Sequence, residues 1–270
     1  MAETQYPLER RAGEIERLHA QGDALVADTS IMLHRIGVAA GWRCLDLGCG
    51  PRGITDLLGK RVGPTGRVVG LDADAVFLDH ARQHADSRNL VNVEFVTGDV
   101  FRTGLPAGTF DLVHTRFVAS TIGNAERLLH ECVPLTRPGG FVAFQEADIS
   151  TLNCYPSNHA WERLKGAFTV VFPHIAGKPW SPHVLYRTFR QLGLEDVQYR
   201  PFLVGFRPSD PMADYLPATM ESVRSALMEK RSIDANELDV AIAACRAHLA
   251  DPSTVSTYHT VVQVWGKRRD

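Results

Sequence analysis

Four short apolar runs of this chain each end in polar residues that can bind a small ligand. These residues are Asp46 with Gly48, then Asp72, Asp99 and His114. A carboxylate accepts hydrogen bonds from hydroxyl and amino groups, and an imidazole exchanges a proton near neutral pH. If the runs are parallel strands, their carboxyl ends lie at one edge of a sheet, where the ligands of such sheets bind. The spacing therefore predicts a single polar ligand site.

A glycine turn follows the first run, 42–47, and the rest of the site is organised around it. Gly48 and Gly50 lack a Cβ, so the backbone can bend sharply there and a ligand can approach closely. Apolar residues then recur at helical spacing over 54–58, and the start of that helix would direct its free N–H groups toward the ligand. We expect a strand, a tight turn and a helix that together bind a nucleotide-like ligand.

Two kinds of nucleotide site fit this turn. The glycines at 48, 50 and 53 satisfy the dinucleotide fingerprint G-x-G-x-x-G, with Asp72 in the place of the ribose-binding acid. Asp46 lies two residues before the first glycine, where the negative charge of a pyrophosphate would be repelled by a carboxylate. A ligand with a cationic sulfonium and an amino group tolerates a carboxylate at that position. The turn alone leaves both alternatives open.

Strands and helices alternate between residues 42 and 147. The apolar runs at 42–47, 67–71, 91–96, 110–114 and 141–146 are separated by turns or by segments with helical spacing. This order predicts an α/β fold with a parallel sheet and helices on both of its faces. With 270 residues and 44% hydrophobic content, the chain is expected to form one large domain over 1–270.

Composition narrows the classes of partner. The net charge is −2, with 29 basic and 31 acidic residues intermixed, so the chain lacks the basic stripe that a nucleic-acid backbone requires. No apolar run reaches roughly 18 residues and the N-terminus is polar, so we expect a cytoplasmic protein without a membrane span. The five cysteines include no C-x-x-C pair, and His80 and His84 have no third ligand nearby in sequence. We therefore expect no metal site.

An ordered series of motifs decides between the two nucleotide sites. The series is DLGCG at 46–50, GLD at 70–72, GDV at 98–100, FDLV at 110–113 and LTRPGG at 135–140. It resembles the motif series of the class I S-adenosylmethionine (SAM) methyltransferases and spans roughly 42 to 147. An NAD-binding oxidoreductase, the less favoured alternative, leaves the last three motifs unexplained. The resemblance implies SAM as the cofactor and a Rossmann-like sheet of seven mostly parallel strands.

The same resemblance implies roles for individual residues. Asp72 would accept hydrogen bonds from both ribose hydroxyls, and Asp99 would bind the adenine amino group. Arg52 stands where members of the family often have glycine, and it would crowd the amino-acid end of SAM, pair with its carboxylate, or face solvent. The implied cofactor-binding positions are Asp46, Gly48, Cys49, Gly50, Asp72, Ala73, Asp99, Val100 and Thr115.

His114 is the candidate general base, because it closes the fourth strand beside the transferred methyl group. A base is needed only if the acceptor arrives protonated, since methyl transfer from a sulfonium is otherwise a matter of positioning and water exclusion. The alternative is a hydrogen-bonded structural histidine. Arg116, His174 and Met220 are the candidate substrate-binding residues, and Glu146 and Asp148, at the end of the fifth strand, are candidates for orienting a substrate amine or hydroxyl.

Segments outside the motif series are expected to cover the site. Residues 1–40 read as a helical lid with a helix over 7–38, 41–150 as the SAM-binding core, and 206–254 as a helical cap inserted before the last strand. A sixth strand is expected over 195–205 and two helices over 210–249. The insert carries an apolar stripe that includes Met212, Met220 and Met228, which would line either the substrate pocket or the core of the cap. Aromatic residues between 155 and 180 favour an apolar pocket for a small molecule.

These observations lead to one expected function and one alternative on the same fold. We expect a methyltransferase of the bacterial small-molecule type that acts on a small, largely apolar or aromatic metabolite of specialised metabolism. The alternative is a cyclase that binds SAM without consuming it. The acceptor atom is open between oxygen, nitrogen and carbon, and a homodimer is compatible with the sequence.

Overall fold

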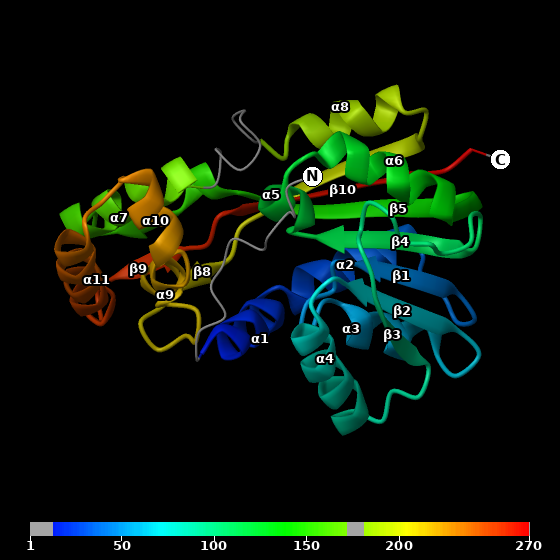
Figure 1. Cartoon of the computed structure of the whole chain (residues 1–270), viewed down its shortest axis with the longest axis horizontal. Coiled ribbons are helices and arrows are strands. Elements are labelled where there is room, and N and C mark those ends of the chain that lie inside the picture. Colours follow the sequence, from blue (N-terminus) through cyan, green and yellow to red (C-terminus); the bar gives the residue numbers. More distant parts are fainter. Residues whose placement is uncertain (1–12, 172–180, 270) are drawn as a thin grey trace.

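The computed structural model describes residues 13–171 and 181–269 of the chain. Its helices are α1 Glu14–Ala24, α2 Val26–Ile36, α3 Thr55–Val62, α4 Ala75–Ser87, α5 Val118–Ile122, α6 Ala125–Leu135, α7 His159–Val171, α8 Val184–Gln191, α9 Tyr215–Ser222, α10 Arg224–Lys230 and α11 Ala235–Leu249. Its strands are β1 Arg43–Leu47, β2 Arg67–Asp72, β3 Val93–Thr97, β4 Phe110–Arg116, β5 Thr136–Asp148, β6 Asn153–Tyr155, β7 Glu195–Phe202, β8 Gly205–Phe206, β9 Val255–Thr257 and β10 Thr260–Lys267. Figure 1 shows their arrangement.

Seven strands form the main sheet in the order β3-β2-β1-β4-β5-β10-β7. The pairs β1–β2, β1–β4, β2–β3 and β4–β5 are parallel, and β10 runs antiparallel to both β5 and β7. The prediction of a mostly parallel seven-stranded sheet is confirmed. Because the chain reverses its strand order beside β1, the carboxyl ends of β1 and β4 flank a crevice of the kind that binds ligands in such sheets.

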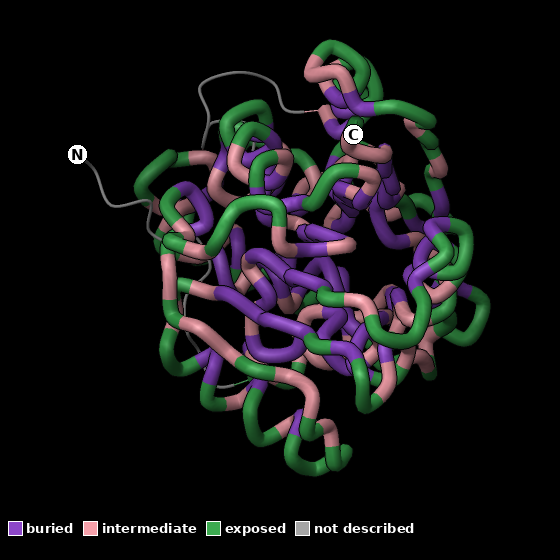
Figure 2. The backbone as a smooth tube through the Cα atoms, turned by 90° about the vertical axis from the view of Figure 1, so that its right-hand side faces the viewer, coloured by how far each residue is buried: buried purple, intermediate pink, exposed green. Residues whose placement is uncertain are grey.

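Side chains alternate between the two faces of the sheet, and each face has its own helical cover. Leu45, Val113 and Phe144 belong to a cluster that contains residues of α6 and α8. Cys44 and Leu112, one position earlier in β1 and β4, belong to a second cluster with residues of α2 and α3. Figure 2 shows this buried interior enclosed by exposed segments. Helices therefore cover both faces, as the alternation of strands and helices predicted.

A second hydrophobic body lies at one end of the sheet (Figure 1). It unites α7, α9, α10 and α11 with a small sheet in the order β6-β9-β8. We call it the cap. The prediction of two helices in the insert was wrong, because the chain leaves the helical conformation at Val223 and again at Arg231, where φ is +51°. The expected strand 195–205 is likewise divided, since β7 stays in the main sheet and β8 joins the cap.

The N-terminal segment also differs from the single helix expected over 7–38. It forms α1 and α2, which are separated at Leu25. Leu25 is 1% exposed and belongs to the hydrophobic cluster of the cap. The break therefore lets α1 lie against α9 while α2 stays on the sheet. Residues 7–12 of the expected helix lie outside the described residues.

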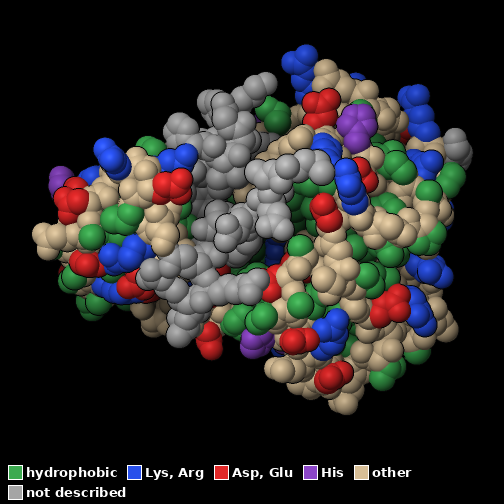
Figure 3. Space-filling view, in the orientation of Figure 1, with side chains coloured by type: hydrophobic (Ala, Val, Ile, Leu, Met, Phe, Trp, Pro, Cys, Tyr) green, Lys and Arg blue, Asp and Glu red, His purple; other side chains and the backbone are tan. Residues whose placement is uncertain are grey.

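The surface and the helices give two further observations about partners. On the face shown in Figure 3, positive and negative side chains are interspersed over the sheet body and the cap. Within 13–171 and 181–269, no helix is both long and apolar enough to cross a bilayer.

Candidate functional site

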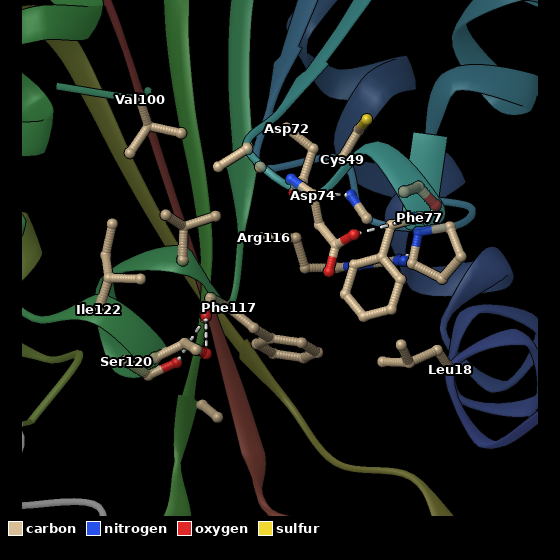
Figure 4. Close-up of a pocket in the computed structure, with 18 of the residues that line it drawn as sticks. Leu18, Cys49, Asp72, Asp74, Phe77, Val100, Arg116, Phe117, Ser120 and Ile122 are labelled. Carbon is tan, nitrogen blue, oxygen red and sulfur yellow. Dashed lines mark hydrogen bonds between the residues drawn. The ribbon is translucent and has the colours of Figure 1, made fainter. Parts of the chain in front are cut away.

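A cavity of about 1050 Å³ opens at the carboxyl ends of β1, β2 and β4 and extends to the cap. Its cofactor half is bounded by the glycine turn and by the segments after β2 and β3, and its other half by α9 and the β9–β10 connection. Figure 4 shows Asp72, Asp74 and Phe77 on one side of the cavity, with Phe117 and Ser120 across from them. Three of the polar strand ends identified in the sequence, Asp46 with Gly48, Asp72 and Asp99, therefore lie around one space.

The glycine turn takes a shape that other residues would strain. Gly48 has φ of +68°, and a Cβ there would lie 2.3 Å from a methyl carbon of Val118. The Gly48 and Cys49 amides both donate to the Leu71 carbonyl oxygen, at 2.7 and 3.1 Å, which fastens the turn to β2. Gly50 has φ of +57°, yet a Cβ there would meet no atom within 4 Å. A ligand can therefore approach the backbone closely at Gly50.

Asp72 is held firmly beside this turn. Its Oδ2 accepts from the Gly50 amide at 2.8 Å and its Oδ1 from the Asp74 amide at 2.9 Å. Burial raises the pKa of Asp72, while these two backbone hydrogen bonds oppose the rise. A carboxylate has about four acceptor positions, so two remain for ligand hydroxyls. Asp99 lies across the cavity, and its Oδ1 accepts from the Phe101 amide at 2.8 Å.

Both carboxylate oxygens of Asp46 have hydrogen-bond partners within the protein. Its Oδ2 accepts from the Ile54 amide at 2.8 Å, and its Oδ1 lies 2.7 Å from Nδ1 of His114. Gly53 must be glycine for this arrangement, because it has φ of +56° and a Cβ would lie 2.3 Å from Oδ2 of Asp46. Asp46 therefore fixes the end of β1 to the start of α3, and the turn between them takes its shape from that contact.

The cap half of the cavity is lined mainly by aromatic and small side chains. Phe117 follows β4, Phe168 belongs to α7, Tyr215 and Thr219 belong to α9, and His259 precedes β10. Phe117 has φ of +60°, a conformation that costs a non-glycine residue on the order of 1–3 kcal/mol and is found most often at functional sites. Its amide donates to the Gln145 carbonyl oxygen at 2.9 Å, so β5 holds the residue in that conformation.

Helix α1 connects the two halves. Glu14 is 3% exposed, pairs with Arg17 at 2.8 Å and accepts from the Ser222 hydroxyl of α9 at 3.0 Å. Two turns after Glu14, Gln21 donates to the Tyr258 hydroxyl. Arg17, Leu18 and Gln21 all line the cavity. The helix therefore covers the space between the sheet and the cap.

Comparison with known proteins agrees with this geometry. The sequence profile of a methyltransferase domain matches residues 44–140. The demethylmenaquinone methyltransferase of Geobacillus kaustophilus is 31% identical over 188 residues, which cover 64% of this chain and 80% of that protein. The chain belongs to the class I SAM-dependent methyltransferase family.

Two further likenesses extend over most of this methyltransferase. The 2-phytyl-1,4-naphtoquinone methyltransferase of Thermosynechococcus vestitus is 29% identical over 211 residues, 70% of this chain and 92% of that protein. The solved structure of the [4+2]-cyclase SpnF covers 99% of this chain and 88% of its own, with 15% identity and a TM-score of 0.53, a likeness of fold. Other curated relatives match over less of their length, with 39%, 46% and 51% covered in three of them.

The residues of the cofactor half fit SAM, the methyl donor of this family. Asp72 keeps free acceptor positions for ribose hydroxyls, and the open space at Gly50 admits the ligand to the backbone. Arg116 donates to the Gly53 carbonyl oxygen at 2.9 Å, and burial lowers its pKa. Its guanidinium would face the carboxylate of the methionine part. The expected positions that line the cavity are Asp46, Gly48, Cys49, Gly50, Asp72, Ala73, Asp99, Val100 and Arg116.

Three of the expected positions lie away from the methyltransferase cavity. The His114 side chain is completely buried, with Nδ1 at Asp46 and Nε2 at 2.9 Å from the Gln145 amide nitrogen, so its position does not fit a general base. Thr115 is fully buried on β4 beside it. Met220 is 0% exposed and packs in the core of the cap, and it does not line the cavity. His174 lies outside the described residues.

Arg52 does not face solvent, and it borders the cavity beside the glycine turn. Its side chain is buried, pairs with Asp23 of α1 at 2.6 Å and lies 3.7 Å from Asp56. It also donates to the His19 carbonyl oxygen at 3.0 Å. The residue that replaces the family's glycine therefore joins the cofactor turn to α1. Sequence reasoning missed this because the partners lie about 30 residues earlier in the chain.

Two acidic residues at the carboxyl end of β5 are candidates for orienting the substrate. Glu146 is fully buried and accepts from the Ala119 and Ser120 amides at 3.0 and 2.9 Å, so it holds the start of α5. Asp148 lies 3.0 Å from Nε2 of His183, outside the cavity lining. The lining residues that sequence reasoning missed include Arg17, Gln21, Phe117, Tyr215, Thr219 and His259. Of these, Phe117 alone had a sequence signal, since it directly follows the fourth strand.

Proposed function

We propose that the protein transfers the methyl group of SAM to a small, largely apolar or aromatic metabolite. The observation that carries this proposal is the continuity of one cavity from Asp72 and Asp99 to the aromatic lining of the cap. A cofactor bound at the strand ends would direct its reactive end toward Phe117, at the boundary of the two halves. An apolar pocket with few polar groups is typical of small-molecule sites.

When bound, SAM supplies an activated methyl group, since its carbon–sulfur bond breaks with the electron pair left on sulfur as the acceptor forms a bond to the methyl carbon. The protein's task is to align the acceptor and exclude water. Helix α1 and the cap do this from opposite sides, because Arg17 and Gln21 of α1 and Tyr215 of α9 all border the space. A hydroxyl acceptor must also release its proton.

The names of two relatives support an acceptor with apolar rings. Both are named for quinones, and both match most of their own length. Flat rings suit the lining described for this chain, where Phe117, Phe168 and Tyr215 offer aromatic faces. We infer an acceptor of this general size and polarity, with the atom that receives the methyl group left to experiment.

The decisive experiment incubates the protein with methyl-labelled SAM and a panel of hydroxylated aromatic metabolites and quinols, followed by mass spectrometry. A product heavier by one labelled methyl group, formed together with S-adenosylhomocysteine, is expected. Titration calorimetry with SAM and with NAD should show binding of SAM alone. Binding of NAD without SAM would overturn the proposal, and rearranged product with unconsumed SAM would favour the cyclase alternative.

A further inference from the structure

His259 is a buried histidine of the cavity whose polar atoms are unused. It lies in the connection between β9 and β10, its side chain is 2% exposed, and it belongs to the cavity lining. Neither Nδ1 nor Nε2 has a hydrogen-bond partner within 13–171 and 181–269. Buried polar side-chain atoms are paired in the large majority of cases, so an unpaired pair of ring nitrogens at a cavity calls for an explanation.

The surroundings of this ring are aromatic. Phe117 and Tyr215 meet it edge to face, each with ring centroids 5.6 Å apart, and Tyr258 lies against it with centroids 3.6 Å apart. These neighbours orient the ring but leave its nitrogens unpaired. Helix α9 closes one side through Tyr215, and the turn after β4 closes another through Phe117. Within the described residues the nitrogens have no protein partner, and a ligand in the cavity can supply one.

The charge state of His259 limits what that ligand can be. Burial, with a smaller contribution from the Arg17 guanidinium, lowers the pKa of His259 to about 3. Its other titratable neighbours, Tyr215 and Tyr258, have pKa values raised by burial and stay neutral. The Glu14 carboxylate, which pairs with Arg17, also accepts a hydrogen bond from the Ser222 hydroxyl. The ring is thus a neutral imidazole, which offers one N–H donor and one nitrogen acceptor.

We propose that His259 binds the hydroxyl group of a neutral aromatic acceptor and so selects which substrates are methylated. A hydroxyl both donates and accepts, which matches the two faces of a neutral imidazole. A cationic amine fits less well, because Arg17 is nearby and the lining carboxylates Asp46, Asp72, Asp74 and Asp99 lie in the cofactor half. The inference rests on the proposed function, since it names the acceptor class of the same cavity.

The test compares two probes that differ only in the hydroxyl group, 2-naphthol and naphthalene. Equilibrium dialysis with saturating S-adenosylhomocysteine should show that the unmodified protein binds 2-naphthol at least about tenfold more tightly, as one well-formed hydrogen bond allows. His259→Phe keeps a flat aromatic ring without polar atoms and should bind naphthalene at least as tightly as 2-naphthol. His259→Gln retains a donor and an acceptor, and should restore part of the preference.

Further measurements distinguish a variant that fails to fold from a variant that folds but does not behave as proposed. His259→Phe should melt at the same temperature as the parent or higher, because it removes two unpaired buried nitrogens. In protein labelled with ¹⁵N-histidine, the His259 signals should stay those of a neutral ring from pH 5 to 8 and move when 2-naphthol binds. A third probe, 2-(aminomethyl)naphthalene, carries a cationic amine in place of the hydroxyl group and should bind more weakly than 2-naphthol.

Several results would overturn the assignment of His259. These are a parent that binds neither probe, equal binding of both, an unchanged preference in His259→Phe, or tighter binding of the amine. Calorimetry with SAM and product analysis with labelled SAM test the proposed function independently of His259. If SAM binds and a methylated product forms while the hydroxyl preference is absent, the proposed function stands and the role of His259 fails. If SAM does not bind, the proposed function itself fails.

Discussion

The Nδ1 atom of His114 lies 2.7 Å from Oδ1 of Asp46, and this contact begins a polar row that crosses five strands. Nε2 of His114 faces the Gln145 amide nitrogen at 2.9 Å, and Oε1 of Gln145 accepts from the Gln263 amide at 2.8 Å. Gln263 accepts in turn from Arg200 at 2.9 Å. Because the Gln145 amide donates, Nε2 must be the acceptor, and Nδ1 carries the proton that is shared with Asp46. His114 is thus a neutral link in the sheet.

Replacement of His114 should therefore cost stability more than chemistry. In His114→Ala, the Asp46 carboxylate and the Gln145 amide lose a buried partner, and a cavity is left behind. We expect the free energy of unfolding to fall by about 2–5 kcal/mol in urea denaturation. The kcat of the folded variant at saturating SAM should change little, with a pH profile parallel to that of the parent.

His183 provides the matched control for His114. It is also a histidine paired with an aspartate, but 43% of its side chain is exposed, so His183→Ala should shift stability by at most about 1 kcal/mol. A stable His114→Ala variant whose kcat falls at neutral pH and recovers at high pH would restore His114 as the general base.

Asp72 should control the affinity for SAM. Asp72→Ala removes two charge-assisted hydrogen bonds to the ribose, each worth roughly 1.5–3 kcal/mol, so titration calorimetry should show a loss of at least about 100-fold. Burial raises the pKa of Asp72, so on acidification this carboxylate takes up its proton at a higher pH than an ordinary aspartate does. SAM binding by the parent should therefore begin to weaken at that higher pH. Asp79→Ala, an exposed change on α4, serves as the control. Parent-like affinity in Asp72→Ala would remove this acid from the ribose.

Glu146 should make the fold less stable as the pH rises. Burial raises its pKa from the ordinary 4.5 to about 7. Between these values the folded protein keeps a proton that the unfolded chain releases, so stability is full below about pH 4.5 and is lost as the pH rises through 7. The loss amounts to about 3 kcal/mol.

The measurement for Glu146 is urea denaturation between pH 5 and 8, for the parent and for Glu146→Gln. The amide does not titrate, so the variant should lack this part of the decline whatever its absolute stability. Equal slopes in the two proteins would show that Glu146 is ionised throughout the range, held so by the Ala119 and Ser120 amides.

The sequence was sufficient for the parts of the fold that local pattern determines. Short apolar runs identified β1, β2, β3, β4 and β5, and the glycine turn with Asp72 identified the cofactor half of the cavity. The helix breaks at Leu25 and Val223 were missed, because each depends on packing against the cap rather than on a proline or glycine.

The acceptor half could not be predicted, because it forms from segments that are remote in sequence. Phe117, Tyr215 and His259 come together only when the cap folds onto the carboxyl edge of the sheet. His114 and His259 show the limit clearly. Sequence position favoured the first as the reactive histidine, yet burial and pairing make it structural and leave the second with unused nitrogens.

Arg52 should couple the cofactor turn to α1. Arg52→Ala removes the ion pair with Asp23 and the hydrogen bond to the His19 carbonyl oxygen, so α1 should exchange its amide protons faster. If α1 covers bound SAM, the dissociation rate of SAM should rise by about tenfold. Asp23→Asn removes only the ion pair and should have a smaller effect, and Gly22→Ala should mimic Arg52→Ala because its Cβ would lie 3.1 Å from the Arg52 side chain. Unchanged amide exchange in α1 would contradict this coupling.

Two residues of α9 should separate the core of the cap from its pocket face. Met220 is completely buried among cap side chains, so Met220→Ala should lower the free energy of unfolding by about 2–5 kcal/mol and leave the KM for the acceptor nearly unchanged. Tyr215 borders the cavity at the other end of the helix, so Tyr215→Ala should raise that KM by about tenfold or more. SAM affinity should stay within about twofold in both variants, because the sheet edge holds the cofactor.

Steady-state kinetics of the product-forming reaction, with urea denaturation of the same samples, test both claims. A higher KM in a stable Met220→Ala variant would place the methionine face of α9 against the substrate.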